Sequence, residues 1–119
     1  MKLPGPDHPI TIAPNSKRVR VTFNGCVIAD TTHALTLKEA ALRPVQYIPR
    51  DDVDMGALAR TTHKTHCPYK GDAAYYSLTV DGRTADNAVW TYETPFPAMT
   101  EIAGHLAFYP DKVKIEELS

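Results

Sequence analysis

The sequence predicts a mainly β fold of antiparallel strands with one or two short helices, and two hairpin patterns support this prediction most directly. Val19, Val21 and Phe23 alternate with polar residues, as in a strand with one buried face. The dipeptide Asn24-Gly25 follows and supplies the positive-φ residues of a type I′ turn, after which CVIAD returns as the partner strand. The aromatic segments AAYYSLTV and NAVWTYE are joined around Asp81-Gly82. We therefore expect two antiparallel hairpins.

Shorter patterns predict the other strands. Residues 1–16 contain four prolines and are expected to form an extended arm, so that residues 17–119 make up a single domain. Residues 33–39 alternate again and indicate a strand. Residues 44–50 form a short extended segment whose prolines favour a sheet edge.

The remaining segments are predicted to add short helices and a last hairpin. Residues 51–60 favour a short helix capped by Asp51 or Asp52, and residues 94–104 allow one or two helical turns. The segments HLAFY and KVKIEEL indicate two strands joined across Pro110-Asp111, a favourable turn pair.

The composition is that of an ordinary soluble protein, with 119 residues, a hydrophobic fraction of 43% and a formal net charge of −1. This charge gives no general attraction to a nucleic-acid polymer or to an anionic membrane. No apolar run is long enough to span a bilayer, and the first residues lack the apolar core of a signal peptide. We therefore expect a cytoplasmic protein in which Cys26 and Cys67 are free thiols.

The segment TTHKTHCPYKG, residues 61–71, concentrates side chains that can perform chemistry. His63, His66 and Cys67 offer three of the four ligands that zinc requires, but His66 and Cys67 are adjacent, and adjacent side chains diverge in extended backbone. We predict no metal site, and instead a turn that carries Cys67 and Lys70 to the rim of a pocket. Surface histidines beside a half-buried thiol are the plainer alternative.

Two chemical roles are open to this turn. Cys67 lies beside His66 and close to Lys70, and both can stabilise a thiolate nucleophile, whereas a buried structural thiol is the alternative. The pair Lys70-Gly71 brings a charged head and an accessible backbone N–H together, which suits a phosphate or a carboxylate. A solvated lysine beside a turn glycine is the alternative there.

Aromatic residues on different predicted strands can form one pocket wall with polar tips. They are Tyr47, Tyr76, Trp90 and Tyr92. Arg50 lies close to Tyr47 in the sequence, and together with Lys70 it would place cations at the rim. Such a pocket suits a flat anionic ligand such as a nucleotide, although strand aromatics also serve simply as core and cross-strand pairs.

Four phrases in this order resemble the bacterial family known as domain of unknown function 427: VQYIPRDDVDM, THCPYKGDAAYYS, NAVWTYETP and IAGHLAFYPDKV. The resemblance covers residues 17–118 and implies a β-tent fold, in which two small antiparallel sheets lean together. The family carries a nucleotidyltransferase-like label without an assigned reaction. Zinc-binding members of the wider β-tent group use two C-x-x-C pairs, and this sequence has neither.

The positions that match the family motif are a mixture of turn, core and polar residues. They are Tyr47, Pro49, Arg50, Asp52, Val53, Cys67, Pro68, Tyr69, Lys70, Gly71, Ala74, Tyr76, Trp90, Tyr92, His105, Phe108 and Tyr109.

Three functions are compatible with these patterns. The first is binding of a small anionic, nucleotide-like molecule between the sheets, without a cofactor, by a monomer or a weak homodimer. The predicted ligand-binding residues are Tyr47, Arg50, Tyr69, Lys70, Tyr76, Trp90 and Tyr92. The second is an enzyme of nucleotidyl or phosphoryl transfer, with Cys67 or Lys70 as catalytic residue and Mg²⁺ on Asp52 and Asp54. The third is a protein-interaction module without catalysis.

Overall fold

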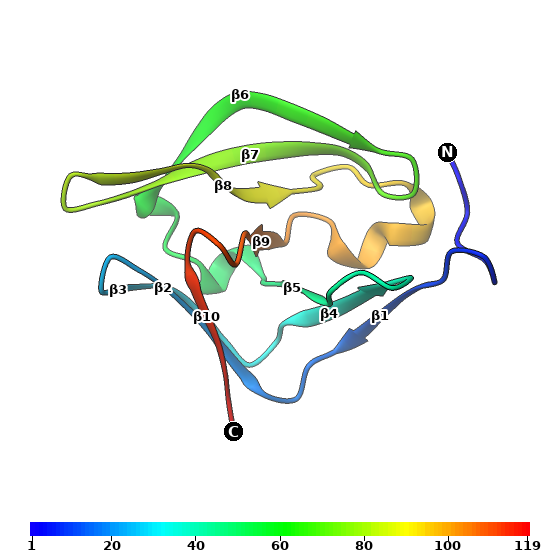
Figure 1. The fold of residues 1–119 in the computed structure, drawn as a ribbon, viewed down its shortest axis with the longest axis horizontal. Helices are drawn as coiled ribbons and strands as arrows, with labels where there is room; N and C mark the ends of the chain where they lie inside the picture. Colours follow the sequence, from blue (N-terminus) through cyan, green and yellow to red (C-terminus); the bar gives the residue numbers. More distant parts are fainter.

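The computed structural model describes residues 1–119 and contains three antiparallel sheets with three short 3₁₀ helices (Figure 1). The strands are β1 (Ile10–Pro14), β2 (Arg18–Phe23), β3 (Cys26–Thr31), β4 (Leu35–Glu39), β5 (Val45–Tyr47), β6 (Leu58–Cys67), β7 (Gly71–Val80), β8 (Arg83–Thr91), β9 (Leu106–Phe108) and β10 (Lys114–Leu118). The helices are η1 (Arg50–Asp52), η2 (Met55–Ala57) and η3 (Pro97–Ile102). The predicted mainly β, antiparallel class with short helices is confirmed.

The sheets have the strand orders β1-β4-β5, β10-β2-β3 and β6-β7-β8-β9. Figure 1 shows the long strands β6, β7 and β8 on one side of the molecule and the two three-stranded sheets on the other. The structure thus has three sheets where the sequence predicted two. The chain leaves β3 at Thr31, and β4 then pairs with β1 and β5 instead of extending the sheet of β2 and β3.

The four-stranded sheet is covered on both faces by hydrophobic side chains. Tyr76 of β7 lies in one buried cluster, with residues of β2 and β3, while the adjacent Tyr75 lies in a second cluster with residues of β4 and β5. Val89 is paired with Tyr76 in the first cluster, and Trp90 is paired with Tyr75 against the second. Because successive side chains of a strand point to opposite faces, residues of β2 and β3 pack against one face of the central sheet and residues of β4 and β5 against the other.

Both predicted hairpins are present. Asn24 and Gly25 have φ of +49° and +79°, and β2 pairs with β3 around them. Asp81 and Gly82 have φ of +50° and +77° between β7 and β8. Left-handed backbone at both central positions is what a type I′ turn requires, so these two dipeptides set the local topology.

The segment 61–67 was predicted as a turn, and this is wrong: it belongs to the ten-residue strand β6, and the turn is confined to Pro68–Lys70. β6 is an edge strand with a register shift between Arg60 and Lys64, and most of its side chains are exposed. An exposed polar edge strand has no apolar face, so no period-two pattern marked it in the sequence.

The final hairpin is also a wrong prediction. β9 pairs with β8, while β10 crosses to β2, so the two strands belong to different sheets. All three residues of β9 are buried, as in a strand that is covered on both faces, whereas β10 is a partly exposed edge strand.

The N-terminal arm and the helices differ in detail from their predictions. The arm is extended, and its residues 10–14 form β1 against β4. The helix expected within residues 51–60 is two 3₁₀ turns, and its capping residue is Asp54, whose carboxylate accepts a hydrogen bond from Gly56 N at 3.1 Å. The short helix predicted within residues 94–104 is η3, with Pro97 at its first position.

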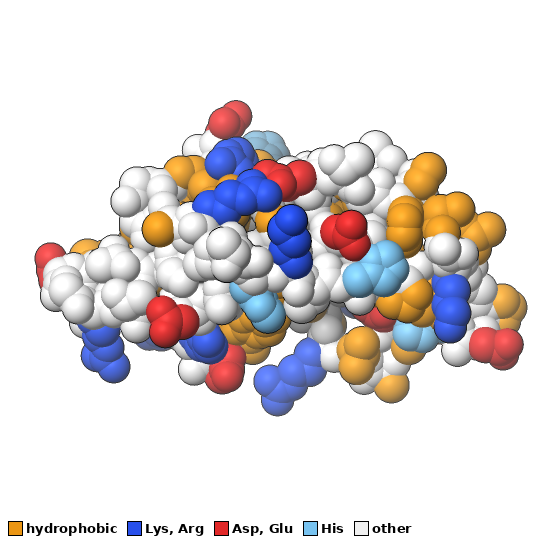
Figure 2. All heavy atoms as spheres, turned by 90° about the horizontal axis from the view of Figure 1, so that it is seen from above, with side chains coloured by type: hydrophobic (Ala, Val, Ile, Leu, Met, Phe, Trp, Pro, Cys, Tyr) orange, Lys and Arg blue, Asp and Glu red, His pale blue; other side chains and the backbone are white.

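The side of the molecule on which β6 lies carries charges of both signs. Figure 2 shows Lys, Arg, Asp, Glu and His side chains interspersed over this side, with hydrophobic side chains gathered at one end. No helix of the structure has the length and apolarity needed to cross a membrane. Cys26 and Cys67 are free thiols, as predicted.

Candidate functional site

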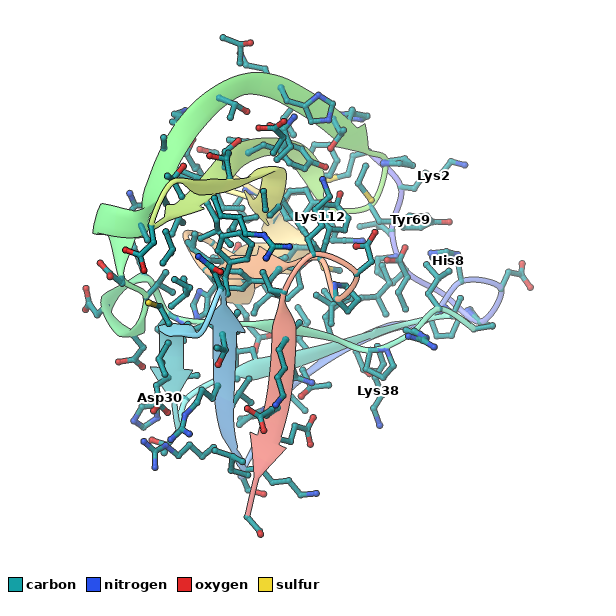
Figure 3. The ribbon with its side chains drawn as sticks, turned by 60° about the vertical axis from the view of Figure 1, so that its left-hand side comes forward. Lys2, His8, Asp30, Lys38, Tyr69 and Lys112 are labelled. Atoms are coloured by element: carbon teal, nitrogen blue, oxygen red, sulfur yellow. The ribbon has the colours of Figure 1, made fainter.

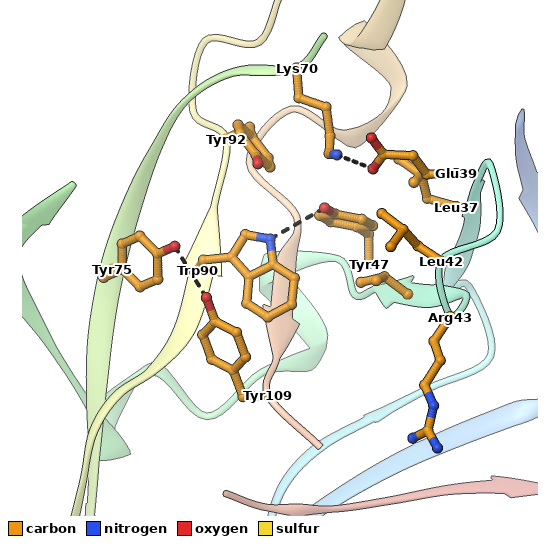
Figure 4. A pocket seen from close by; sticks show the side chains of 11 residues that line it. Leu37, Glu39, Leu42, Arg43, Tyr47, Lys70, Tyr75, Trp90, Tyr92 and Tyr109 are labelled. Carbon is orange, nitrogen blue, oxygen red and sulfur yellow. Dashed lines mark hydrogen bonds and ion pairs between the residues drawn. The ribbon is translucent and has the colours of Figure 1, made fainter. Parts of the chain in front are cut away.

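A cavity of about 230 Å³ lies between the sheet of β4 and β5 and the central sheet, beside the turn Pro68–Lys70 (Figure 4). Its walls are mainly aromatic, formed by Tyr47, Tyr75, Trp90, Tyr92 and Tyr109. Leu37, Leu42 and Val45 add aliphatic surface. Its charged lining residues are Glu39, Arg43 and Lys70. An apolar enclosure with a few polar groups is the usual composition of a small-molecule site.

The polar end of the cavity is a buried ion pair. Lys70 Nζ donates to Glu39 Oε1 at 2.5 Å, and the two side chains are only 9% and 12% exposed. The second carboxylate oxygen, Oε2, lies 2.8 Å from His8 Nε2. Burial acts to raise the pKa of Glu39, but the hydrogen bonds and charges of Lys70 and His8 outweigh it and hold that pKa below its usual value. Glu39 is therefore a carboxylate at neutral pH.

The local backbone explains how Lys70 reaches this buried position. Gly71 has a φ of +115°, a conformation that favours glycine, and it bends the chain from the turn into β7. The carbonyl of Lys70 accepts a hydrogen bond from Phe96 N at 2.9 Å, which anchors the turn to the chain before η3. The lysine side chain is thereby directed to the end of β4, where Glu39 lies.

The N-terminal segment contributes His8 to the same end of the site. The imidazole stacks on the ring of Tyr69 with 4.1 Å between the ring centroids, and Figure 3 shows these two residues beside each other near Lys2. Lys2 N donates to the carbonyl of Pro68 at 2.7 Å. The segment therefore contacts both the turn and the end of β4.

Two phenol groups present unused hydrogen-bond donors to the cavity. Tyr47 Oη accepts a hydrogen bond from Trp90 Nε1 at 3.3 Å, but its own O–H has no acceptor within the chain. Tyr92 is 6% exposed as a residue, and its hydroxyl makes no hydrogen bond within the chain. Since no fully buried side-chain polar atom lacks a partner, this hydroxyl is open to the cavity. Burial is the main cause that raises the pKa of both phenols, so both remain neutral donors at physiological pH.

The opposite wall is a hydrogen-bonded tyrosine pair. Tyr75 Oη and Tyr109 Oη lie 3.2 Å apart, and Tyr75 also contacts Thr65 Oγ1 at 2.9 Å. Burial and then the neighbouring Tyr75 raise the pKa of Tyr109. The Trp90 ring packs 4.5 Å from the ring of Tyr109, so this wall offers aromatic faces and has its hydroxyls paired.

The mouth of the cavity is formed by the segment between β4 and β5. Leu42 lines the cavity although it is 64% exposed, and Arg43 beside it is also exposed. A hydrophobic side chain and a cation thus border the opening.

Four of the predicted site residues line this cavity: Tyr47, Lys70, Trp90 and Tyr92. Tyr76 and Arg50 lie elsewhere, because Tyr76 points to the other face of the central sheet and the Arg50 guanidinium sits 5.9 Å from the centre of its ring. Tyr69 stacks on His8 outside the cavity. Cys67 is half-buried against the second hydrophobic cluster without lining the cavity.

The side chains considered for a metal are engaged separately. His66 Nδ1 lies 2.7 Å from Asp72 Oδ1, and His63 makes an edge contact with the ring of Tyr75. No three His, Cys, Asp or Glu side chains lie close enough together to hold a metal ion.

The carboxylates considered for Mg²⁺ are also in local use, away from the cavity. Asp52 accepts from Thr31 Oγ1 at 2.7 Å, and Asp54 caps η2. The structure therefore does not bring these acids to Cys67 or Lys70.

The predicted ligand-binding residues did not include His8, Glu39, Tyr75 and Tyr109, although Tyr109 was among the positions that match the family motif. The sequence does indicate a role for Glu39, since this residue follows Leu35 and Leu37 on the apolar face of an alternating strand, where a carboxylate needs a partner. No sequence pattern indicates a role for His8, because its contact with Glu39 joins a proline-rich segment to a distant strand end.

Comparison with known proteins identifies the chain at the level of its family. Among curated proteins, none matches this sequence. A family model described as "Domain of unknown function (DUF427)", with the short name NTP_transf_9, matches residues 11–118, nearly the whole chain and all ten strands except the first residue of β1. The protein therefore belongs to the DUF427 family.

Proposed function

We propose that this protein binds a small anionic molecule with a flat apolar body in the aromatic cavity. The single observation that supports this most strongly is the convergence of unused donors in an otherwise apolar enclosure. Tyr92 O–H makes no hydrogen bond within the chain, Tyr47 O–H donates to no acceptor, and Lys70 uses one ammonium hydrogen on Glu39. No fully buried side-chain polar atom lacks a partner, so these donors are open to the cavity, where they can bind an acceptor from outside the chain.

The remainder of the cavity supports a flat ligand body. The rings of Trp90 and Tyr109 lie in contact, and the Tyr47 ring meets Trp90 edge-on with 6.3 Å between centroids. Aromatic faces of this kind stack with planar ligands and add favourable energy beyond the burial of area.

The charges near the cavity favour an anion over a cation. Lys70 and Arg43 carry two positive charges against the single carboxylate of Glu39. A cationic ligand would have to displace a lysine that already holds the only carboxylate lining the cavity.

Catalysis has less support from the geometry. As an ammonium ion, Lys70 donates hydrogen bonds but has no free lone pair for nucleophilic attack. Cys67 has no base within hydrogen-bond distance, and Asp52 and Asp54 lie outside the cavity. The residues of the cavity therefore favour ligand binding without catalysis.

The test uses Trp90, the single tryptophan of the chain, as an intrinsic reporter inside the cavity. We expect at least one member of a panel of small aromatic acids, their neutral amides and nucleotides to change its fluorescence saturably. Tyr92→Phe should weaken that binding about tenfold, the loss expected for one hydrogen bond to a charged group. The matched control Tyr76→Phe, a buried tyrosine of the other cluster, should leave it unchanged. If no compound changes the fluorescence of Trp90 saturably, or if Tyr92→Phe and Tyr76→Phe weaken binding equally, the proposal is wrong.

A further inference from the structure

The cavity size limits the ligand to about one or two rings. The volume is about 230 Å³, whereas a cavity of about 150 Å³ already admits benzene and the sites of drug-sized ligands begin at about 300 Å³. A ligand of this size has room for a ring system and one small polar group. A whole nucleotide would have to leave its sugar and phosphate outside.

The charge at the inner end limits the ligand further. Lys70 and Glu39 neutralise each other, so an incoming anion brings uncompensated charge into a buried position. The carboxylate of Glu39 is already shared by Lys70 and by His8, whose Nε2 lies 2.8 Å from Glu39 Oε2. A singly charged ligand adds the least uncompensated charge to this position, whereas a phosphate monoester adds about −1.5 to −2 charges at neutral pH.

The donors at the inner end match a carboxylate. Tyr47 O–H, Tyr92 O–H and the remaining hydrogens of Lys70 are three donor groups, and an ionised carboxylate accepts up to about four hydrogen bonds with two oxygens. A neutral amide would present its own N–H groups to these donors and leave some of them unsatisfied.

From this size, charge and donor arrangement we infer that the ligand is an aromatic monocarboxylate. Its carboxylate lies at Lys70, Tyr47 and Tyr92, and its ring lies against Trp90 and Tyr109. Leu42 and Arg43 border its outer end. This inference rests on the proposed function, because it names the ligand class of the same cavity.

Calorimetric titration with matched probes tests the ligand class. Indole-3-carboxylate and 2-naphthoate are the probes, their carboxamides are the neutral isosteres, and uridine 5′-monophosphate represents nucleotides. We expect each carboxylate to bind at least about tenfold more tightly than its carboxamide, the difference expected for one charge-assisted hydrogen bond. We expect no measurable binding of the nucleotide.

Variants test the direction in which the ligand lies. Lys70→Met should weaken carboxylate binding about tenfold or more, whereas Arg43→Gln should change it less than about threefold, because Arg43 is exposed to solvent. Near-ultraviolet circular dichroism confirms that each variant keeps its tertiary packing. Tyr92→Phe provides a second variant at the inner end that leaves the ion pair intact.

The outcomes separate this inference from the proposed function. Equal or tighter binding of the carboxamides or the nucleotide, with loss on Tyr92→Phe, overturns the monocarboxylate class but keeps the cavity as a binding site. A large effect of Arg43→Gln without an effect of Lys70→Met overturns the inferred direction. No binding of any probe, together with unchanged Trp90 fluorescence, overturns both.

Discussion

The substitution Glu39→Gln tests whether the buried ion pair holds the N-terminal segment, β4 and the β6–β7 turn together. Glu39 lies at the end of β4 and accepts from Lys70 at 2.5 Å and from His8 at 2.8 Å. Glutamine keeps one carbonyl oxygen for Lys70, but it removes the negative charge and presents an NH₂ group toward His8. The variant therefore leaves the Lys70 ammonium in a buried position without a counter-charge.

The expected loss of stability follows from the burial of the pair. Removing one partner of a buried ion pair costs about 3–5 kcal/mol because the other charge stays buried and uncompensated. Glutamine retains one hydrogen bond, worth about 1 kcal/mol. We therefore expect the free energy of unfolding to fall by about 2–4 kcal/mol. The double variant Glu39→Gln/Lys70→Met should recover most of this loss, because it removes the uncompensated charge as well.

Urea denaturation followed by Trp90 fluorescence measures these free energies. The control is Glu93→Gln, which removes the carboxylate of the Arg60–Glu93 pair. Both N–O distances of this pair are 2.8 Å, but it lies at the surface, where the side chains are 51% and 45% exposed. This control should change the denaturation midpoint little, because solvent screens exposed pairs. A loss below about 0.5 kcal/mol for Glu39→Gln, or no recovery in the double variant, would refute the reasoning.

Three further predictions concern the same region. Tyr92→Phe should change the thermal stability of the ligand-free protein by less than about 1 kcal/mol, since the Tyr92 hydroxyl makes no hydrogen bond within the chain and is open to the cavity; a larger loss of stability would contradict this. Because the pKa of Glu39 is lowered in the folded state, its contribution to stability is fully present above the ordinary carboxyl value of about 4.3 and is lost as the pH falls through the folded pKa; Glu39→Gln should therefore flatten the acid side of the stability profile, and an unchanged profile would contradict this. Gly71→Ala should destabilise the protein by about 1–2 kcal/mol in urea denaturation, because alanine is strained at a φ of +115°, and an equally stable variant would show that the turn relaxes.

Much of the fold could be predicted because its hairpins depend on local chemistry. Asn24-Gly25 and Asp81-Gly82 force tight turns, and the alternating strands on either side have only one way to pair. The pairing of β10 with β2 has no local signal, since it joins residues at opposite ends of the sequence, and β6 is a polar edge without an apolar face. Long-range pairing and exposed edges are therefore where the prediction failed.

The candidate site was predictable only in part, for a geometric reason. Lys70, Tyr47, Trp90 and Tyr92 were identified from their residue types, and the structure places them around one cavity. Tyr76 was chosen over Tyr75, but the central sheet is buried on both faces, so a buried tyrosine at either position fits the sequence equally well. Which face borders the cavity depends on how the three sheets pack, and one strand pattern does not contain that information.

The position of β2 between β3 and β10 has a consequence for the protein during its synthesis. β3 follows β2 closely, so this hairpin can form as soon as both strands leave the ribosome. The other edge of β2 stays open until residues 114–118 are made, because only β10 pairs with it. Until then the nascent chain exposes a strand edge whose inward side chains Val19 and Val21 lack their final cover. Synthesis of β10 is thus the step that closes this edge of β2, and it comes after both strands of each tight hairpin have been made.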